Sequence, residues 1–234
     1  WNGAVLNFGA WSVSILIVLN LIFFTFFSGW FSWGSAIVAR HVIAILVLLA
    51  GCCVVVYTGI ELSSMRGRVF WNTPVLPVLF AVSGLLTGTA ADALCLGLWP
   101  YTGNYDLAGA SGLLTIACAA LCVLTLAIVL LYVVLTYMTG SESAKVPAYR
   151  LLKGSFANAF WVGLITIGLV APLVLFALGQ SLAAAVAELC IIVGGVFLRF
   201  LIVYSDDRRY LPGEAEYWED LPTGDEPFMK SNWG

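Results

Sequence analysis

Five ionisable residues lie within long apolar runs or at their edges: Arg40, His41, Asp92, Glu188 and Arg199. Ionisable groups inside a membrane span are costly, so they are candidates for a functional role by default. Glu188 and Arg199 are eleven residues apart, close to three helical turns, which places them on one helix face about 16 Å apart in depth. Together, the five ionisable residues predict either a polar track through a helix bundle or buried pairs. The pairs would join Arg40 to Asp92, and Arg199 to a backbone carbonyl or to Glu61.

A second polar group lies where one apolar run ends and the next begins. Tyr57 and Glu61 close the first run, and Trp71, Asn72 and Pro74 open the second. A quinone headgroup requires a flat ring to stack against and hydrogen-bond donors for its two carbonyl oxygens. The alternative interpretation is an aromatic belt at the membrane surface with a helix cap.

Composition sets the class of protein. Hydrophobic residues make up 62% of the 234 residues and charged residues 10%, with a mean hydropathy of +1.00. A soluble domain carries about 25% charged residues, so lipid is the solvent that fits this sequence. The few basic residues are scattered, and nothing indicates a nucleic-acid partner. The six cysteines lie in apolar runs without a Cys-x-x-Cys pair, which is typical of packing rather than of metal binding.

Six apolar runs reach the roughly 20 residues that a spanning helix needs. We therefore expect an all-α polytopic bundle with helices at about 5–27, 35–59, 74–96, 108–137, 156–178 and 182–204. An even number of spans places both ends of the bundle on one side. The loops on that side carry most of the Lys and Arg, and the positive-inside rule assigns it to the cytoplasm. Residues 205–234 form a polar tail with several aromatics, which we expect to lie against a partner subunit.

Three stretches resemble the membrane subunit of polysulfide reductase and its NrfD-type relatives. The first joins Tyr57-Thr58-Gly59, Trp71-Asn72-Thr73-Pro74 and Ser83-Gly84-Leu85-Leu86-Thr87-Gly88; the others are residues 194–204 and Phe8-Gly9-Ala10-Trp11. The matches are short, but they occur in the family's order over most of the sequence. The family usually has eight helices, and on this alignment the first two have no counterpart here. Part of the family's quinone pocket comes from those helices.

The resemblance implies a subunit of a redox complex in a prokaryotic cytoplasmic (inner) membrane. Family members bind a quinone, menaquinone or ubiquinone, and hold no metal or haem. They anchor an iron–sulfur subunit with several clusters, which connects to a molybdopterin- or tungstopterin-containing catalytic subunit. In the family this docking face commonly lies outside, in conflict with the positive-inside assignment. A single histidine is also too few for a bis-histidine haem site.

Roles for single residues follow from the same resemblance. Tyr57 would hydrogen-bond a quinone oxygen, with Asn72 and Trp71 beside the headgroup. Arg199 would stabilise a reduced, negatively charged quinone or relay protons. The candidates for the proton path are five residues: Glu61, Glu188, Asp92, His41 and Arg40. For His41, a structural role at the membrane interface is the alternative.

Three other functions compete with this one. A passive anchor would recruit the iron–sulfur subunit without touching quinone. A transporter or proton channel would show repeated halves with interrupted helices, and no repeat is evident, with Pro172 alone interrupting a helix interior. A membrane hydrolase is disfavoured because the sequence has neither Gly-x-Ser-x-Gly nor His-Glu-x-x-His.

Overall fold

The computed structural model describes residues 2–26, 36–65, 68, 70–98, 107–140 and 142–206. The helices are α1 (Asn2–Thr25), α2 (Ile37–Ser63), α3 (Val75–Leu98), α4 (Leu107–Thr139), α5 (Glu142–Leu152), the π-helix η2 (Ala159–Val170), α6 (Ala171–Ala177) and α7 (Ser181–Ser205). Among the described residues, six helical stretches are long and apolar enough to cross a membrane, with η2 and α6 forming one of them. No strand occurs among the described residues, so the predicted all-α polytopic fold is confirmed. The predicted tail contact lies outside the described residues beyond Asp206.

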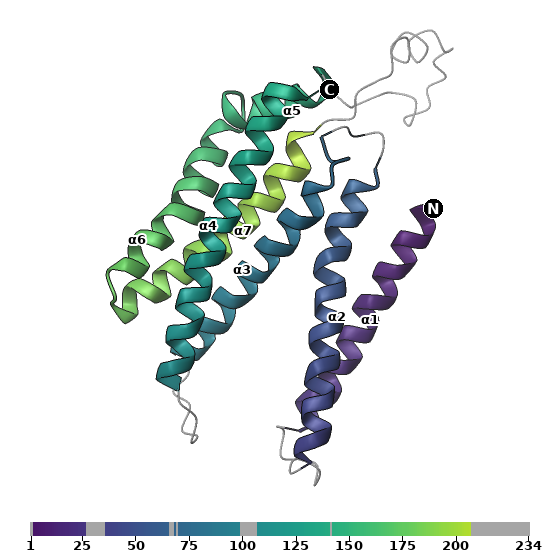
Figure 1. Cartoon of the computed structure of the whole chain (residues 1–234), viewed down its shortest axis with the longest axis vertical. Coiled ribbons are helices and arrows are strands. Elements are labelled where there is room, and N and C mark those ends of the chain that lie inside the picture. The colour runs from purple at the N-terminus through teal and green to yellow at the C-terminus, as the bar shows by residue number, and fades with distance from the viewer. Residues whose placement is uncertain are drawn as a thin grey trace, which may run out of the picture.

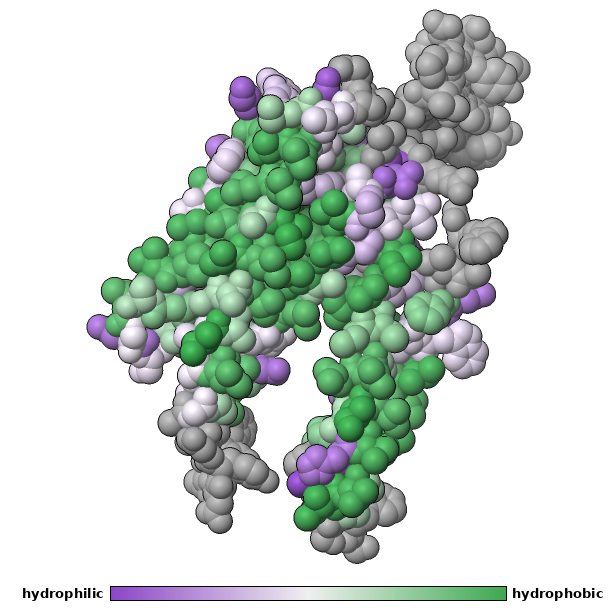
Figure 2. Space-filling view, in the orientation of Figure 1, coloured by the Kyte–Doolittle hydropathy of each residue, from purple (hydrophilic) through white to green (hydrophobic). Residues whose placement is uncertain are grey.

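The spans run alternately up and down (Figure 1). One end of the molecule holds the start of α1, the α2–α3 connection, α5 and the end of α7; we call this the α5 end. The opposite end holds the start of α2, the end of α3 and the turn between α6 and α7. Hydrophobic residues cover most of the visible surface between the two ends, as a bilayer requires, and hydrophilic residues gather beside α5 (Figure 2).

Helix α5 lies where the sequence analysis expects only a loop. Its eleven residues are too few and too polar for a span, because Glu142, Lys145 and Arg150 interrupt the apolar ones. Ala144, Ala148 and Leu151 are buried against the bundle. The helix therefore closes one end of the bundle instead of crossing the membrane.

Four rods of helix form the core: α3, α4, η2 with α6, and α7. Side chains from all four meet on the bundle axis, among them Leu79, Cys122, Leu164 and Leu198, each at most 2% exposed. Helices α1 and α2 form a hairpin that joins the bundle through α2 and α3. Figure 2 shows this hairpin and the bundle separating towards the opposite end. In the most apolar windows of α1 and α2 only 11% of residues are buried, against 33–44% in the other spans.

The fifth span is not the single α-helix that the sequence predicts for 156–178. Residues 159–170 form a π-helix, which is rare at this length and often marks a functional site. It ends at Val170, two residues before Pro172, and the Ala171 N–H bonds to the Thr166 carbonyl five residues back. Proline has no N–H and its ring disfavours an α-helical carbonyl four residues earlier, so the wider turn accommodates it.

Candidate functional site

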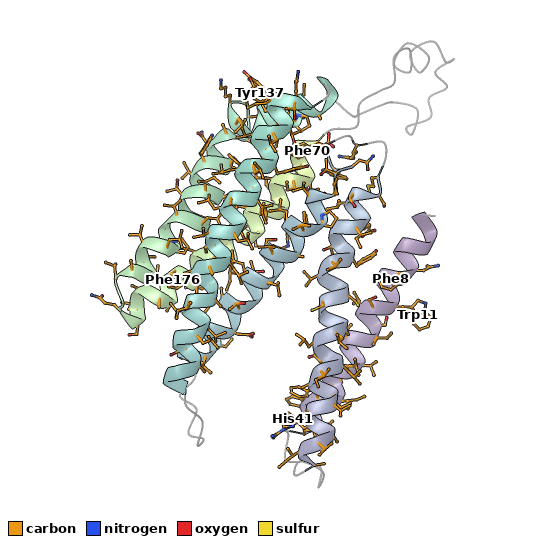
Figure 3. The ribbon with its side chains drawn as sticks, viewed as in Figure 1. Phe8, Trp11, His41, Phe70, Tyr137 and Phe176 are labelled. Atoms are coloured by element: carbon orange, nitrogen blue, oxygen red, sulfur yellow. The ribbon has the colours of Figure 1, made fainter. Side chains whose placement is uncertain are left out.

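Tyr57 is held near the end of α2 by the backbone of α1. Gly9 lies directly under the phenol ring, so close that a Cβ at Gly9 would overlap the ring and the hydroxyl oxygen. The Phe8 ring lies beside it, 6.5 Å from the Tyr57 ring centre at 57°. Tyr57 is 9% exposed, whereas Trp11, on the same helix as Gly9, points away from the bundle (Figure 3). The absence of a side chain at Gly9 thus creates the seat of Tyr57.

Glu61 follows Tyr57 by one helical turn, and its carboxylate interacts with the Tyr57 hydroxyl. Residues four apart on a helix lie on one face, which brings the two groups together. Glu61 is half-buried. The pair combines a phenol O–H donor with a carboxylate that accepts a hydrogen bond or a proton. These two predicted site residues are therefore neighbours.

The corner between α2 and α3 is fixed by aromatic packing. Phe70 is fully buried, its ring centre is 5.1 Å from that of Tyr132 on α4, and its carbonyl accepts a hydrogen bond from the Tyr132 hydroxyl. Trp71 is 5% exposed, and the Arg68 guanidinium lies 4.2 Å from its ring centre. Asn72, the next residue, is exposed. Of the two neighbours, Asn72 faces outward and Trp71 is occupied by packing.

The same corner closes the C-terminal end of α7. The last four carbonyls of a helix have no partner within it. The Trp71 indole N–H donates to the Ile202 carbonyl at 2.8 Å, and the Arg150 guanidinium donates to the Ser205 carbonyl at 3.4 Å. Arg68 donates to the Asp206 carbonyl. Cations are also favoured at the negative end of the helix dipole. We call these three donors, Arg68, Trp71 and Arg150, the α7 clamp.

Replacing Trp71 with Phe should destabilise the fold by about 1–2 kcal/mol, because it removes one clamp donor and leaves a buried carbonyl unpaired. Thermal unfolding of the protein in lipid nanodiscs measures the effect. Trp161→Phe is the matched control: its indole donates to the Leu152 carbonyl at 3.1 Å, but the ring is 42% exposed. Equal losses in both variants would show that the Trp71 bond has no special role.

Arg199 lies apart from the Tyr57–Glu61 pair. Its guanidinium turns back along α7 and donates to the Gly195 carbonyl at 2.8 Å, which is the backbone pairing given as an alternative above. It lies beside Thr87 of α3, since a Cβ on Gly195 would touch both side chains. Within the described residues, no hydrogen bond or ion pair joins Arg199 to Tyr57.

The remaining proton-relay candidates lie elsewhere. Glu188 is 5% exposed, inside the bundle near Cys118 of α4. Asp92 is exposed on α3, and Arg40 is half-buried at the start of α2. His41 is exposed at the opposite end (Figure 3), with Nδ1 2.7 Å from the Ile37 carbonyl of its own helix. These proton-relay candidates therefore lie in separate parts of the structure and do not form one continuous path.

Sequence reasoning assigned no site role to Gly9 or Phe8, although it noted the stretch that contains them. The signal was a glycine beside an aromatic at the start of an apolar run. What that glycine accommodates depends on which helix packs against it, so the sequence alone did not show its role.

Six apolar spans with a polar, aromatic corner at one end define the class: a multi-pass α-helical membrane protein. The family model described as "Polysulphide reductase, NrfD" matches residues 5–206, and the protein belongs to that family. It is 31% identical over 155 residues to the C subunit of polysulfide reductase from Wolinella succinogenes, an alignment covering 64% of this sequence and 48% of that protein. It is 28% identical over 169 residues to protein NrfD of Escherichia coli K12, covering 68% and 51% respectively.

The sequence thus spans about half the length of these curated relatives. No solved structure matched it. Within the described residues, no group of three or more His, Cys, Asp and Glu side chains is placed to hold a metal ion.

Proposed function

We propose that this protein is the quinone-interacting membrane subunit of a multi-subunit redox enzyme. It exchanges electrons between the membrane quinone pool and an iron–sulfur subunit that docks at the α5 end. The observation that carries the proposal is the Tyr57–Glu61 pair, seated on Gly9 near the end of a span. Membership of the NrfD family supports it. A molybdopterin- or tungstopterin-containing subunit would complete the complex, and a prokaryotic cytoplasmic membrane would hold it.

The residues of the pair fit a quinone headgroup, either menaquinone or ubiquinone. When a headgroup binds, the single O–H of Tyr57 turns from Glu61 to one ring oxygen, and the Phe8 ring provides an aromatic edge beside it. Both groups come from apolar helices, so a hydrophobic quinone reaches them from the lipid. Trp71 is left out of this site because its ring is enclosed beneath Arg68.

Oxidation of a quinol releases two electrons and two protons. The Glu61 carboxylate is placed to accept a proton from the quinol O–H, since it lies beside the hydroxyl that positions the ring. Glu61 lies in the last turn of α2, where water at the membrane surface can take the first proton onward and leave the carboxylate free to accept the second. The two electrons pass to the nearest cluster of the docked iron–sulfur subunit. Asn72, exposed at the same end, marks the face on which docking is proposed.

Purification in mild detergent, followed by photolabelling with an azido-quinone, tests this proposal. Co-purified iron and extractable quinone are expected, with the label on peptides around Gly9 and Tyr57. Excess unlabelled quinone should suppress the label. Iron without specific label would instead support a passive anchor. Label on α6 or α7 alone would place the quinone site on those helices and not at Tyr57. A protein that purifies without iron or quinone would overturn the redox assignment.

A further inference from the structure

A wedge-shaped groove separates the α1–α2 hairpin from the four-rod bundle (Figure 2). Near the α5 end, α2 and α3 are in contact. A Cβ on Gly59 would lie 2.5 Å from the Cα of Pro77, and a Cβ on Gly84 would lie 2.7 Å from a methyl carbon of Val55. Beyond these contacts the two helices part towards the opposite end. We call the space between α2 and α3 beyond these contacts the hairpin wedge.

The hairpin wedge begins one helical turn beyond the contact. Gly88 follows Gly84 by four residues on α3, and Gly51 precedes Val55 by four residues on α2, so each glycine continues the side that touches the other helix. Nothing lies within 4 Å of a Cβ built on either glycine. Because neither wall has a side chain at this level, the backbone of a further helix can approach both walls closely.

Two ionisable side chains lie at the open end of the wedge. His41 precedes Gly59 by eighteen residues, which is five helical turns, so it lies on the side of α2 that faces α3. Figure 3 shows His41 on the side of the hairpin towards the bundle. Asp92 follows Gly88 by one turn on α3 and is exposed. Among the described residues, no hydrogen bond or ion pair reaches the Asp92 carboxyl group.

The position of Asp92 indicates what could fill the wedge. It lies six residues before the end of α3 at Leu98, about 9 Å along the helix. A carboxyl group that faces hydrocarbon is costly, and such groups in membrane proteins pair with another side chain or with backbone. A lipid tail or the tail of a quinone offers neither a hydrogen-bond donor nor a positive charge. A Lys or Arg side chain offers both, and a neighbouring helix can carry it to this depth.

We propose that the hairpin wedge receives one transmembrane helix of another subunit, apolar except for a Lys or Arg that pairs with Asp92. The backbone of this helix packs on Gly51 and Gly88, and His41 can hydrogen-bond a polar group near its end. Only 11% of the residues in the most apolar windows of α1 and α2 are buried. The added helix would hold this hairpin against the bundle, whether or not quinone binds beside Tyr57.

Binding of a synthetic helix in nanodiscs tests the proposal. Bimane is attached to the exposed Cys95, three residues after Asp92, and the other cysteines that are not buried, Cys52, Cys53 and Cys190, are replaced by alanine. The probe is a Leu/Ala peptide of about 23 residues, with one Trp to quench bimane and one Lys at the depth of Asp92. Half-maximal quenching is expected at a peptide-to-lipid ratio about 5- to 30-fold lower than for the same peptide with Leu instead of Lys. Asp92→Asn should remove that preference.

Two glycine variants show where the peptide binds. Gly88→Leu should abolish quenching by either peptide, because the new side chain fills the wedge. Gly112→Leu on α4 is the matched control, since a Cβ there also meets nothing within 4 Å but lies outside the wedge.

Three results would overturn the proposal. Equal binding of the Lys and Leu peptides would favour lipid or a quinone tail in the wedge. A preference for Lys that survives in Asp92→Asn would separate the cation from this carboxyl group. A disulfide between His41→Cys and Asp92→Cys in the protein alone would show that the hairpin closes the wedge by itself.

Discussion

Replacing Tyr57 with Phe should lower quinol-dependent electron transfer about 10- to 100-fold while the complex still assembles. The change removes one oxygen from a ring already seated on Gly9, so packing is kept. A hydrogen bond involving a charged group contributes about 1.5–3 kcal/mol, which corresponds to this range of rates. Steady-state turnover of the purified complex, with a soluble quinol and an artificial acceptor, measures the loss in kcat/KM.

Two further variants make this test specific. Tyr204→Phe applies the same substitution to an exposed ring at the same end of the molecule and should leave turnover unchanged. Gly9→Ala should impair turnover although Tyr57 is intact, because the added methyl group displaces the phenol from its seat. Normal turnover in Tyr57→Phe would remove Tyr57 from the mechanism. A defect in Tyr57→Phe without one in Gly9→Ala would support the role of Tyr57 but show that Gly9 is not needed to position its ring.

Replacing Gly194 with Ala should destabilise the protein by about 3 kcal/mol, the largest stability effect that we predict. Gly194 of α7 and Gly168 of η2 meet backbone to backbone, and a Cβ on Gly168 would lie 2.6 Å from the Cα of Gly194. Membrane helices associate through such small-residue contacts, because lipid gives no hydrophobic drive between them. A backbone cannot move aside as a side chain can, so the two helices must separate.

Unfolding in nanodiscs, followed by tryptophan fluorescence, measures this loss. Gly51→Ala on α2 is the matched control, since nothing lies within 4 Å of a Cβ built there. That variant should be neutral or slightly stabilised, because alanine is the better helix former. Gly168→Ala should behave like Gly194→Ala. Similar stabilities for the Gly51 and Gly194 variants would contradict the close packing of η2 and α7.

The sequence by itself determined the class of the molecule. Apolar runs of spanning length can satisfy their backbone groups in lipid only as helices, so six runs predicted the observed all-α bundle. Short motifs, spaced along the sequence, were sufficient for the family. Helix α5 was missed because an eleven-residue amphipathic segment has no spanning signal. The π-helical geometry of η2 was missed because the same run of apolar residues is compatible with an α-helix or a π-helix.

The candidate site, too, was predicted only in part from the sequence. Tyr57 and Glu61 are four residues apart, so the sequence placed them on one face before any packing was known. Only the tertiary structure set Gly9 beneath the phenol and enclosed Trp71 below Arg68. These facts depend on which helices meet and at what depth. Spacing along the sequence determines the face of a helix, and contacts between helices determine what that face meets.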